Sequence, residues 1–147
     1  MILTSPAFAN GQAMAATFSK EAGNVSPPLE WHDAPLGTHS YALIIVDHHP
    51  VAHDFVHWML ADIPPTATAL AQGASAAGLP PNAKELHMYF GPLPPVGSGV
   101  HTYECTLFAL DVPACGLPPN ATLDAFLQAT APHTLATAQL SGTYIRA

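Results

Sequence analysis

Short apolar runs alternate with turn-forming prolines and glycines along the whole chain of 147 residues. Three runs are long enough to cross a sheet: 40–47 (SYALIIVD), 55–63 (FVHWMLADI) and 101–112 (HTYECTLFALDV). Their β-branched and aromatic content is typical of strands. Shorter candidate strands are residues 2–4, 29–31, 86–90 and 142–147. Sixteen prolines and ten glycines leave little room for long helices.

Two helices are expected near the C-terminus. The segment 120–131 has Thr122 as a candidate N-cap. Its apolar face would consist of Leu123, Phe126 and Leu127. The segment 134–140 (TLATAQL) is a shorter helical candidate. Many short strands followed by a helical segment predict one domain over residues 1–147, a mainly β protein with small helices at the periphery of a sandwich.

Charge narrows the choice of partner. The permanent cations are Lys20, Lys84 and Arg146, against ten acidic residues, for a net charge of -7. This balance argues against nucleic acid and anionic lipid as partners. No segment approaches the roughly 20 apolar residues of a membrane helix, and the first residues lack the basic start of a secretory signal. We therefore expect a cytoplasmic protein, without membrane insertion, whose partner is a small molecule or another protein.

The stretch 46–60 (VDHHPVAHDFVHWML) contains four of the nine histidines. On a helix, His49, His53 and His57 would share one face and suggest a metal site. Pro50 argues against this geometry, because a residue that precedes proline rarely adopts the helical conformation. A metal site built from His48, His49, His53 and His57 stays as a third hypothesis.

Read as a strand, 55–63 places alternate side chains on opposite faces. One predicted face carries Phe55, His57, Met59 and Ala61, and the other carries Val56, Trp58, Leu60 and Asp62. In 101–112 the residues His101, Tyr103 and Cys105 share a face in the same way. Asp47 ends an apolar strand, where a core would not tolerate an unpaired carboxylate. A polar site at the strand ends is one interpretation, and scattered surface histidines are the other.

Seven motifs, in order, resemble one known family. They are NVSPPLEW (24–31), AP-G-T-S-AL (34–43), the aspartate at 47, HWML-DIP (57–64), GPLPP (91–95), HTYECTLFALD (101–111) and L-A-AQLSGTY (135–144). Together they cover nearly the whole chain. The sequence is similar to the phosphatidylethanolamine-binding proteins, and within them to the bacterial and archaeal branch called Raf-kinase-inhibitor-like.

The resemblance implies a sandwich of two antiparallel sheets with small C-terminal helices, and a pocket that binds phosphate-like or carboxylate groups. The family's pocket residues fall on Asp47, His57, Gly91, Pro92, His101 and Tyr103. Two departures affect the pocket. His49 stands where the family has the second aspartate of Asp-Pro-Asp-Ala-Pro, and Tyr89 or Phe90 stands where a glycine precedes the Gly-Pro loop. Accessory candidates are His49, Tyr89 and Trp58.

The leading hypothesis is a non-enzymatic protein that binds a small anion or a phosphorylated group, without cofactor or metal, and that serves as a regulatory, inhibitor-like protein. The expected donors are the ring N–H groups of His57 and His101, the Tyr103 hydroxyl and backbone N–H groups near Gly91. Asp47 would accept a proton from one of the histidines. The resemblance also implies a homodimer, and the identity of any protein partner stays open.

The alternative hypothesis is a hydrolase or another acid–base enzyme, because His, Asp and Tyr can shuttle protons. The sequence shows no Gly-x-Ser-x-Gly elbow. Cys105 lies in an apolar run and is expected to be a buried, structural thiol.

Overall fold

The computed structural model describes residues 1–147 as nine strands, one α-helix and three short 3₁₀ helices. The strands are β1 (Ile2–Thr4), β2 (Gln12–Ala13), β3 (Leu29–His32), β4 (Ser40–Asp47), β5 (Phe55–Ile63), β6 (Ala69–Leu70), β7 (Lys84–His87), β8 (His101–Leu110) and β9 (Thr134–Tyr144). The helices are α1 (Leu123–Thr130), η1 (Ala16–Phe18), η2 (Pro50–Ala52) and η3 (Ala131–His133).

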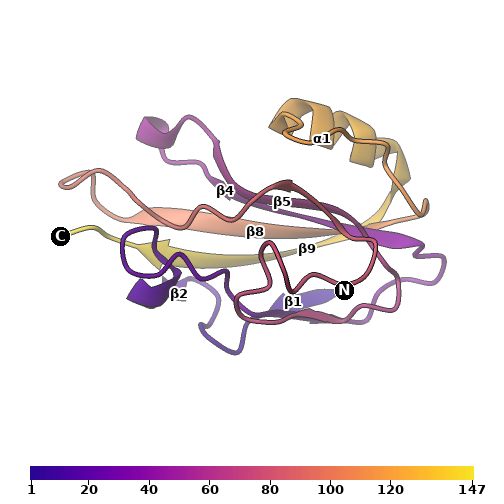
Figure 1. Cartoon of the computed structure of the whole chain (residues 1–147), viewed down its shortest axis with the longest axis horizontal. Helices are drawn as coiled ribbons and strands as arrows, with labels where there is room; N and C mark the ends of the chain where they lie inside the picture. The colour runs from indigo at the N-terminus through magenta and orange to yellow at the C-terminus, as the bar shows by residue number, and fades with distance from the viewer.

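The strands form two sheets. The larger has the order β2-β9-β8-β4-β5-β7 and the smaller the order β1-β3-β6. Neighbouring strands are antiparallel except for β2 and β9, which run parallel. Helix α1 covers one face of the large sheet and the small sheet lies on the other (Figure 1). The predicted mainly β sandwich with a peripheral helix is confirmed.

Two apolar cores follow from this layering. The larger lies between the sheets and includes Leu43, Trp58 and Leu107, all fully buried. The smaller lies under α1, where the rings of Phe108 and Phe126 meet edge to face at 5.4 Å. Full burial of a large apolar side chain stabilises a fold by about 1.5–3 kcal/mol. The central strands β4 and β8 supply side chains to both cores, so the large sheet forms a rigid base.

Helix α1 begins where the sequence predicts. The Thr122 hydroxyl accepts a hydrogen bond from the Ala125 N–H at 3.1 Å, which confirms the N-cap. Phe126 is fully buried, whereas Leu127 is 42% exposed. The prediction that Phe126 belongs to the buried face of the helix is therefore confirmed, and the prediction that Leu127 belongs to it is wrong.

The helix predicted over 134–140 is wrong, because these residues belong to β9. The strand pairs with β8 along nearly its whole length, from His101 opposite Tyr144 to Leu110 opposite Thr134. Ala138 and Leu140 turn inward, and Thr137 and Gln139 turn outward. This period of two is typical of a strand with one buried face. Pairing with β8 outweighs the intrinsic helical preference of alanine and leucine, as tertiary contacts commonly do.

A β-bulge in β5 overturns the predicted alternation of side chains. Ile45 lies opposite Trp58 and Val46 opposite Val56, so that His57 has no partner in β4. An extra residue of this kind shifts the side-chain alternation by one position. His57 and Trp58 therefore lie on the side of the small sheet, while Met59 packs under α1. The alternation predicted for β8 is confirmed, since Tyr103 and Cys105 both belong to the inter-sheet core.

Candidate functional site: a pocket where three strands meet

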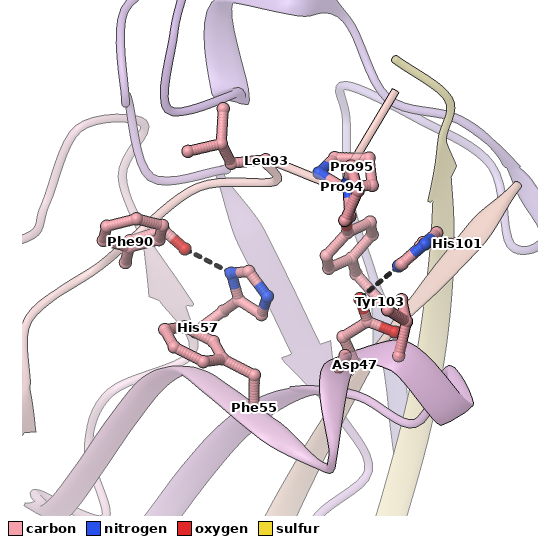
Figure 2. Close-up of a pocket in the computed structure, with 11 residues that line it drawn as sticks. Asp47, Phe55, His57, Phe90, Leu93, Pro94, Pro95, His101 and Tyr103 are labelled. Carbon is pink, nitrogen blue, oxygen red and sulfur yellow. Dashed lines mark hydrogen bonds and ion pairs between the residues drawn. The ribbon is translucent and has the colours of Figure 1, made fainter. Parts of the chain in front are cut away.

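A pocket of about 190 Å³ opens at one end of the large sheet. Asp47, the last residue of β4, lies opposite Phe55 on one side and Tyr103 on the other. Its polar lining comes from Asp47, His57, His101 and Tyr103 (Figure 2). Its apolar lining comes from Val51, Ala52, Phe55, Phe90, Leu93, Pro94 and Pro95. The fold therefore brings together side chains from β4, β5 and β8 that are far apart in sequence.

Asp47 and His101 form a buried pair beneath the pocket. Asp47 Oδ2 lies 2.6 Å from His101 Nδ1, and the two side chains are 4% and 1% exposed. The other ring nitrogen, Nε2, lies 2.9 Å from the Ser98 hydroxyl oxygen. The Ser98 hydroxyl donates its hydrogen to the Pro95 carbonyl at 2.7 Å. The Nδ1–H group of His101 donates to the Asp47 carboxylate, and Nε2 shares a second hydrogen bond with the Ser98 hydroxyl.

The Asp47 carboxylate has no free oxygen for a ligand. Oδ1 accepts a hydrogen bond from the His49 N–H at 2.9 Å, and Oδ2 accepts from His101. A buried carboxylate that is paired and hydrogen-bonded avoids most of the desolvation cost. Both Asp47 oxygens therefore already accept hydrogen bonds from protein donors before an anion enters the pocket.

His57 has one ring nitrogen available to a ligand. Its Nδ1–H donates to the Phe90 carbonyl, and Nε2, which has no such bond, lies on the side of Tyr103 (Figure 2). Burial lowers the pKa of His57 from the ordinary value of 6.5, and the Phe90 carbonyl and Asp47 only partly offset this effect. In the free protein at neutral pH, Nε2 is therefore a hydrogen-bond acceptor.

Tyr103 supplies a donor beside this nitrogen. Its ring meets the His57 ring edge to face at a centroid distance of 4.9 Å. The side chain is 1% exposed and lines the pocket, and its hydroxyl has no hydrogen-bond partner in the protein. Burial, followed by the nearby Asp47, raises the pKa of Tyr103, so the hydroxyl keeps its proton at all ordinary pH values.

Gly91 and Pro92 do not line the pocket. The Gly91 N–H donates to Asn24 Oδ1 at 2.6 Å, and the Pro92 carbonyl accepts from the Lys20 N–H at 3.0 Å. The backbone donor expected at Gly91 is therefore engaged with another part of the chain. Leu93, two residues further on, does line the pocket and its N–H makes no hydrogen bond in the protein. The Leu93 N–H is therefore the candidate backbone donor in place of the Gly91 N–H.

Gly91→Ala is expected to destabilise the fold by about 1–3 kcal/mol, a typical cost of overpacking. A Cβ at this position would lie 2.1 Å from the Phe18 carbonyl oxygen, so the backbone must shift. Chemical denaturation of both proteins measures the loss. Gly97→Ala is the control, because a Cβ there meets nothing within 4 Å and only its φ of +83° is unfavourable. An equal loss in both variants would contradict the assigned close contact.

The accessory candidates separate into one pocket neighbour and two core residues. The His49 ring stacks on His101 at 3.9 Å with an interplanar angle of 7°. The Tyr89 hydroxyl donates to the Phe18 carbonyl at 2.8 Å, and the Trp58 Nε1–H donates to Glu85 at 2.7 Å. Neither of these two lines the pocket. His49 therefore packs against the Asp47–His101 pair through its contact with His101. Tyr89 and Trp58 belong to the core between the sheets.

Ser98 was not singled out by the sequence, and its hydroxyl contacts the His101 ring next to the pocket. Phe90 and three residues of the GPLPP motif, Leu93, Pro94 and Pro95, line the opening. The Lys20 ammonium lies 5.0 Å from the centroid of the Phe90 ring. The GPLPP motif marked this loop, but which of its residues face the pocket depends on how the loop is tied to residues 18–24.

Three of the four histidines of the metal hypothesis contact different partners. His48 pairs with Asp54 at 2.6 Å, His49 stacks on His101, and His57 binds the Phe90 carbonyl. No group of three His, Cys, Asp or Glu side chains is arranged to hold a metal ion. The hypothesis loses its geometric basis.

The two cysteines are free thiols. Burial raises the pKa of Cys105 to about 12, and burial together with Asp62 raises the pKa of Cys115 to about 11. The reactive form of cysteine is the thiolate. Neither thiol therefore supplies a nucleophile near neutral pH, which removes one route for the enzyme hypothesis.

The β-sandwich thus carries a small pocket at its strand ends, lined by both polar and apolar side chains. Residues 4–145 match the family model described as phosphatidylethanolamine-binding protein. The chain belongs to the phosphatidylethanolamine-binding protein family, and the resemblance drawn from its motifs is confirmed. No helix in the structure has the length and apolar character needed to cross a membrane.

Relatives and solved structures agree with this assignment. The chain is 39% identical over 146 residues to LppC of Mycobacterium tuberculosis, which carries the name of a lipoprotein; the match covers 98% of this chain and 72% of LppC. It is 35% identical to a UPF0098 protein of Methanothermobacter thermautotrophicus, with 99% of each chain covered. Escherichia coli YbcL superposes with a TM-score of 0.92 at 25% identity, covering 99% of this chain and 98% of YbcL. CT736 of Chlamydia trachomatis superposes with a TM-score of 0.83 at 30% identity, covering 99% of this chain and 97% of CT736.

Proposed function

We propose that the protein binds phosphate or a small phosphomonoester in this pocket and does not transform it. One observation supports the proposal above the others: His57 Nε2 and the Tyr103 hydroxyl lack protein partners in a pocket whose only carboxylate is already paired. The unbonded Leu93 N–H provides a third polar group. Tyr103 and Leu93 donate to the anion at every ordinary pH.

Binding at His57 requires a proton. Because Nδ1–H is donated to the Phe90 carbonyl, Nε2 can bind an anionic oxygen only when the ring is doubly protonated or when the oxygen carries a hydrogen. A phosphomonoester loses its second proton at a pKa of about 6, and His57 has a pKa below 6.5. The phosphomonoester can carry the shared proton near pH 6, and His57 can carry it at pH values below its lowered pKa. Both have lost the proton well above pH 7. Affinity therefore falls as the pH rises through this range.

The expected affinity is modest. A hydrogen bond to a charged group contributes about 1.5–3 kcal/mol. Three such bonds, less the costs of desolvation and immobilisation, correspond to a Kd on the order of micromolar to millimolar. The volume of about 190 Å³ suits a small ligand and falls below the usual range for drug-sized molecules.

A histidine NMR titration tests the proposal. Without ligand, His57 is expected to titrate below pH 6.5, because burial lowers its pKa. Methyl phosphate places an anion beside Nε2, so the His57 pKa should rise on binding. The exposed His32 of β3 serves as the internal control and should not respond. A His57 resonance that stays unmoved at tens of millimolar ligand would remove the proposal.

Three broader expectations belong to the same proposal. A regulatory role with a protein partner and a homodimer are supported by the family resemblance, not by a contact in this structure. The cytoplasmic location also stays a prediction, because one relative carries the name of a lipoprotein.

A further inference from the structure

An aromatic wall adjoins the polar end of the pocket. The Phe55 and Phe90 rings have centroids 5.5 Å apart, and the Phe55 ring lies 4.7 Å from the ring of His57. Both phenylalanines line the pocket, on the His57 side of Tyr103 (Figure 2). A ligand atom bound to His57 Nε2 would therefore lie near apolar carbon as well as near polar donors.

Part of this wall faces water in the free protein. Phe55 is 44% exposed and Val51 is 47% exposed, and both line the pocket. Leu93, Pro94 and Pro95 continue the apolar lining on the loop side. Inorganic phosphate would leave this apolar surface exposed to water. An apolar group attached to the phosphate would remove water from it, and apolar burial favours binding in proportion to the area covered.

Phe90 is held in place before any ligand arrives. Its N–H donates to the His57 carbonyl at 2.8 Å, and its own carbonyl accepts from the His57 ring. The Lys20 ammonium lies 5.0 Å from the ring centroid, within the range of a cation–π contact. A wall that is already ordered costs little further entropy on binding.

We propose that this pocket selects phosphomonoesters with an apolar substituent, which packs on Phe55 and Phe90 while the phosphate binds His57 and Tyr103. The inference rests on the proposed function and names its ligand class. Phe90 is then a specificity-determining residue. An aromatic substituent suits the wall well, because aromatic rings pack favourably edge to face or offset at such distances.

Calorimetry with phenyl phosphate and methyl phosphate at pH 6 tests the proposal. Both are phosphomonoesters, so their ratio of affinities isolates the substituent. Phenyl phosphate is expected to bind the natural protein about tenfold more tightly, as roughly 1.4 kcal/mol of apolar burial would give. Phe90→Ala should reduce the ratio to about twofold, and Phe55→Ala should reduce it in the same direction.

Two controls keep the outcomes distinct. Val96→Ala removes an exposed apolar side chain outside the pocket and should keep the tenfold ratio. Phe90→Leu retains apolar contact and should give an intermediate ratio, which guards against a folding defect in Phe90→Ala. Equal affinity of the natural protein for both esters would overturn the inference while the proposed function stands. Binding of neither ester would overturn both.

Discussion

His57→Ala is expected to weaken the binding of methyl phosphate at pH 6 by about 10- to 150-fold. The variant removes a charge-assisted hydrogen bond, which contributes about 1.5–3 kcal/mol. Calorimetry measures the loss directly. The variant should also lose much of the pH dependence of binding, because it removes the ring nitrogen at which the shared proton is held and whose pKa burial lowers from 6.5.

His32→Ala is the matched control. This histidine is exposed on β3 in the small sheet, and its replacement should leave affinity and pH dependence unchanged. If His57→Ala bound methyl phosphate as tightly as the natural protein, His57 would not be a ligand-binding residue. If it bound less tightly but with the same pH dependence, the shared proton would lie elsewhere.

Asp47→Ala is expected to lower the free energy of unfolding by about 3–5 kcal/mol, the usual cost of removing one partner of a buried ion pair. The change leaves the His101 ring, which is 1% exposed, without its acceptor at Nδ1. It also leaves the His49 N–H without the carboxylate oxygen that it contacts at 2.9 Å. Urea denaturation measures the loss.

The chain provides a matched exposed pair. Asp111 lies 2.9 Å from His133 Nδ1, with side chains 46% and 41% exposed. Because exposed ion pairs contribute about 0–1 kcal/mol, Asp111→Ala should cost no more than this. The double variant with Asp47→Ala and His101→Ala should cost less than the sum of the single variants, since each removes the same interaction. Additive losses would show that the two side chains do not stabilise each other.

The residues of the pocket differ in how far the sequence could reveal them. Strand periodicity placed His101 and Tyr103 on one face, and Asp47 stood out at the end of an apolar strand, since β4 and β8 are regular at these positions. That they form one site was implied only by the family resemblance. The family resemblance singled out His57, but side-chain alternation along β5 did not predict which face of the large sheet His57 lies on. The bulge that turns it towards the pocket depends on how β4 and β5 pair, and the sequence of β5 alone carries no signal for that register.

Long-range packing explains the other differences. Gly91 was expected at the pocket, with backbone N–H donors near it, whereas it allows the close approach of residues 18–20, some 70 positions earlier in the chain. The segment 134–140 has a composition that suits either a helix or a strand, and the free edge of β8 selects the strand. In both cases the local sequence leaves two states open, and a partner far away in the chain decides between them.

A crystal structure of the protein with phenyl phosphate at pH 6 tests the central claim most directly. The account predicts tetrahedral density within about 2.7–3.1 Å of His57 Nε2 and the Tyr103 hydroxyl, usual hydrogen-bond distances. The phenyl ring should lie against Phe55 and Phe90. An empty pocket at tens of millimolar ligand, or a phosphate bound elsewhere on the protein, would contradict it.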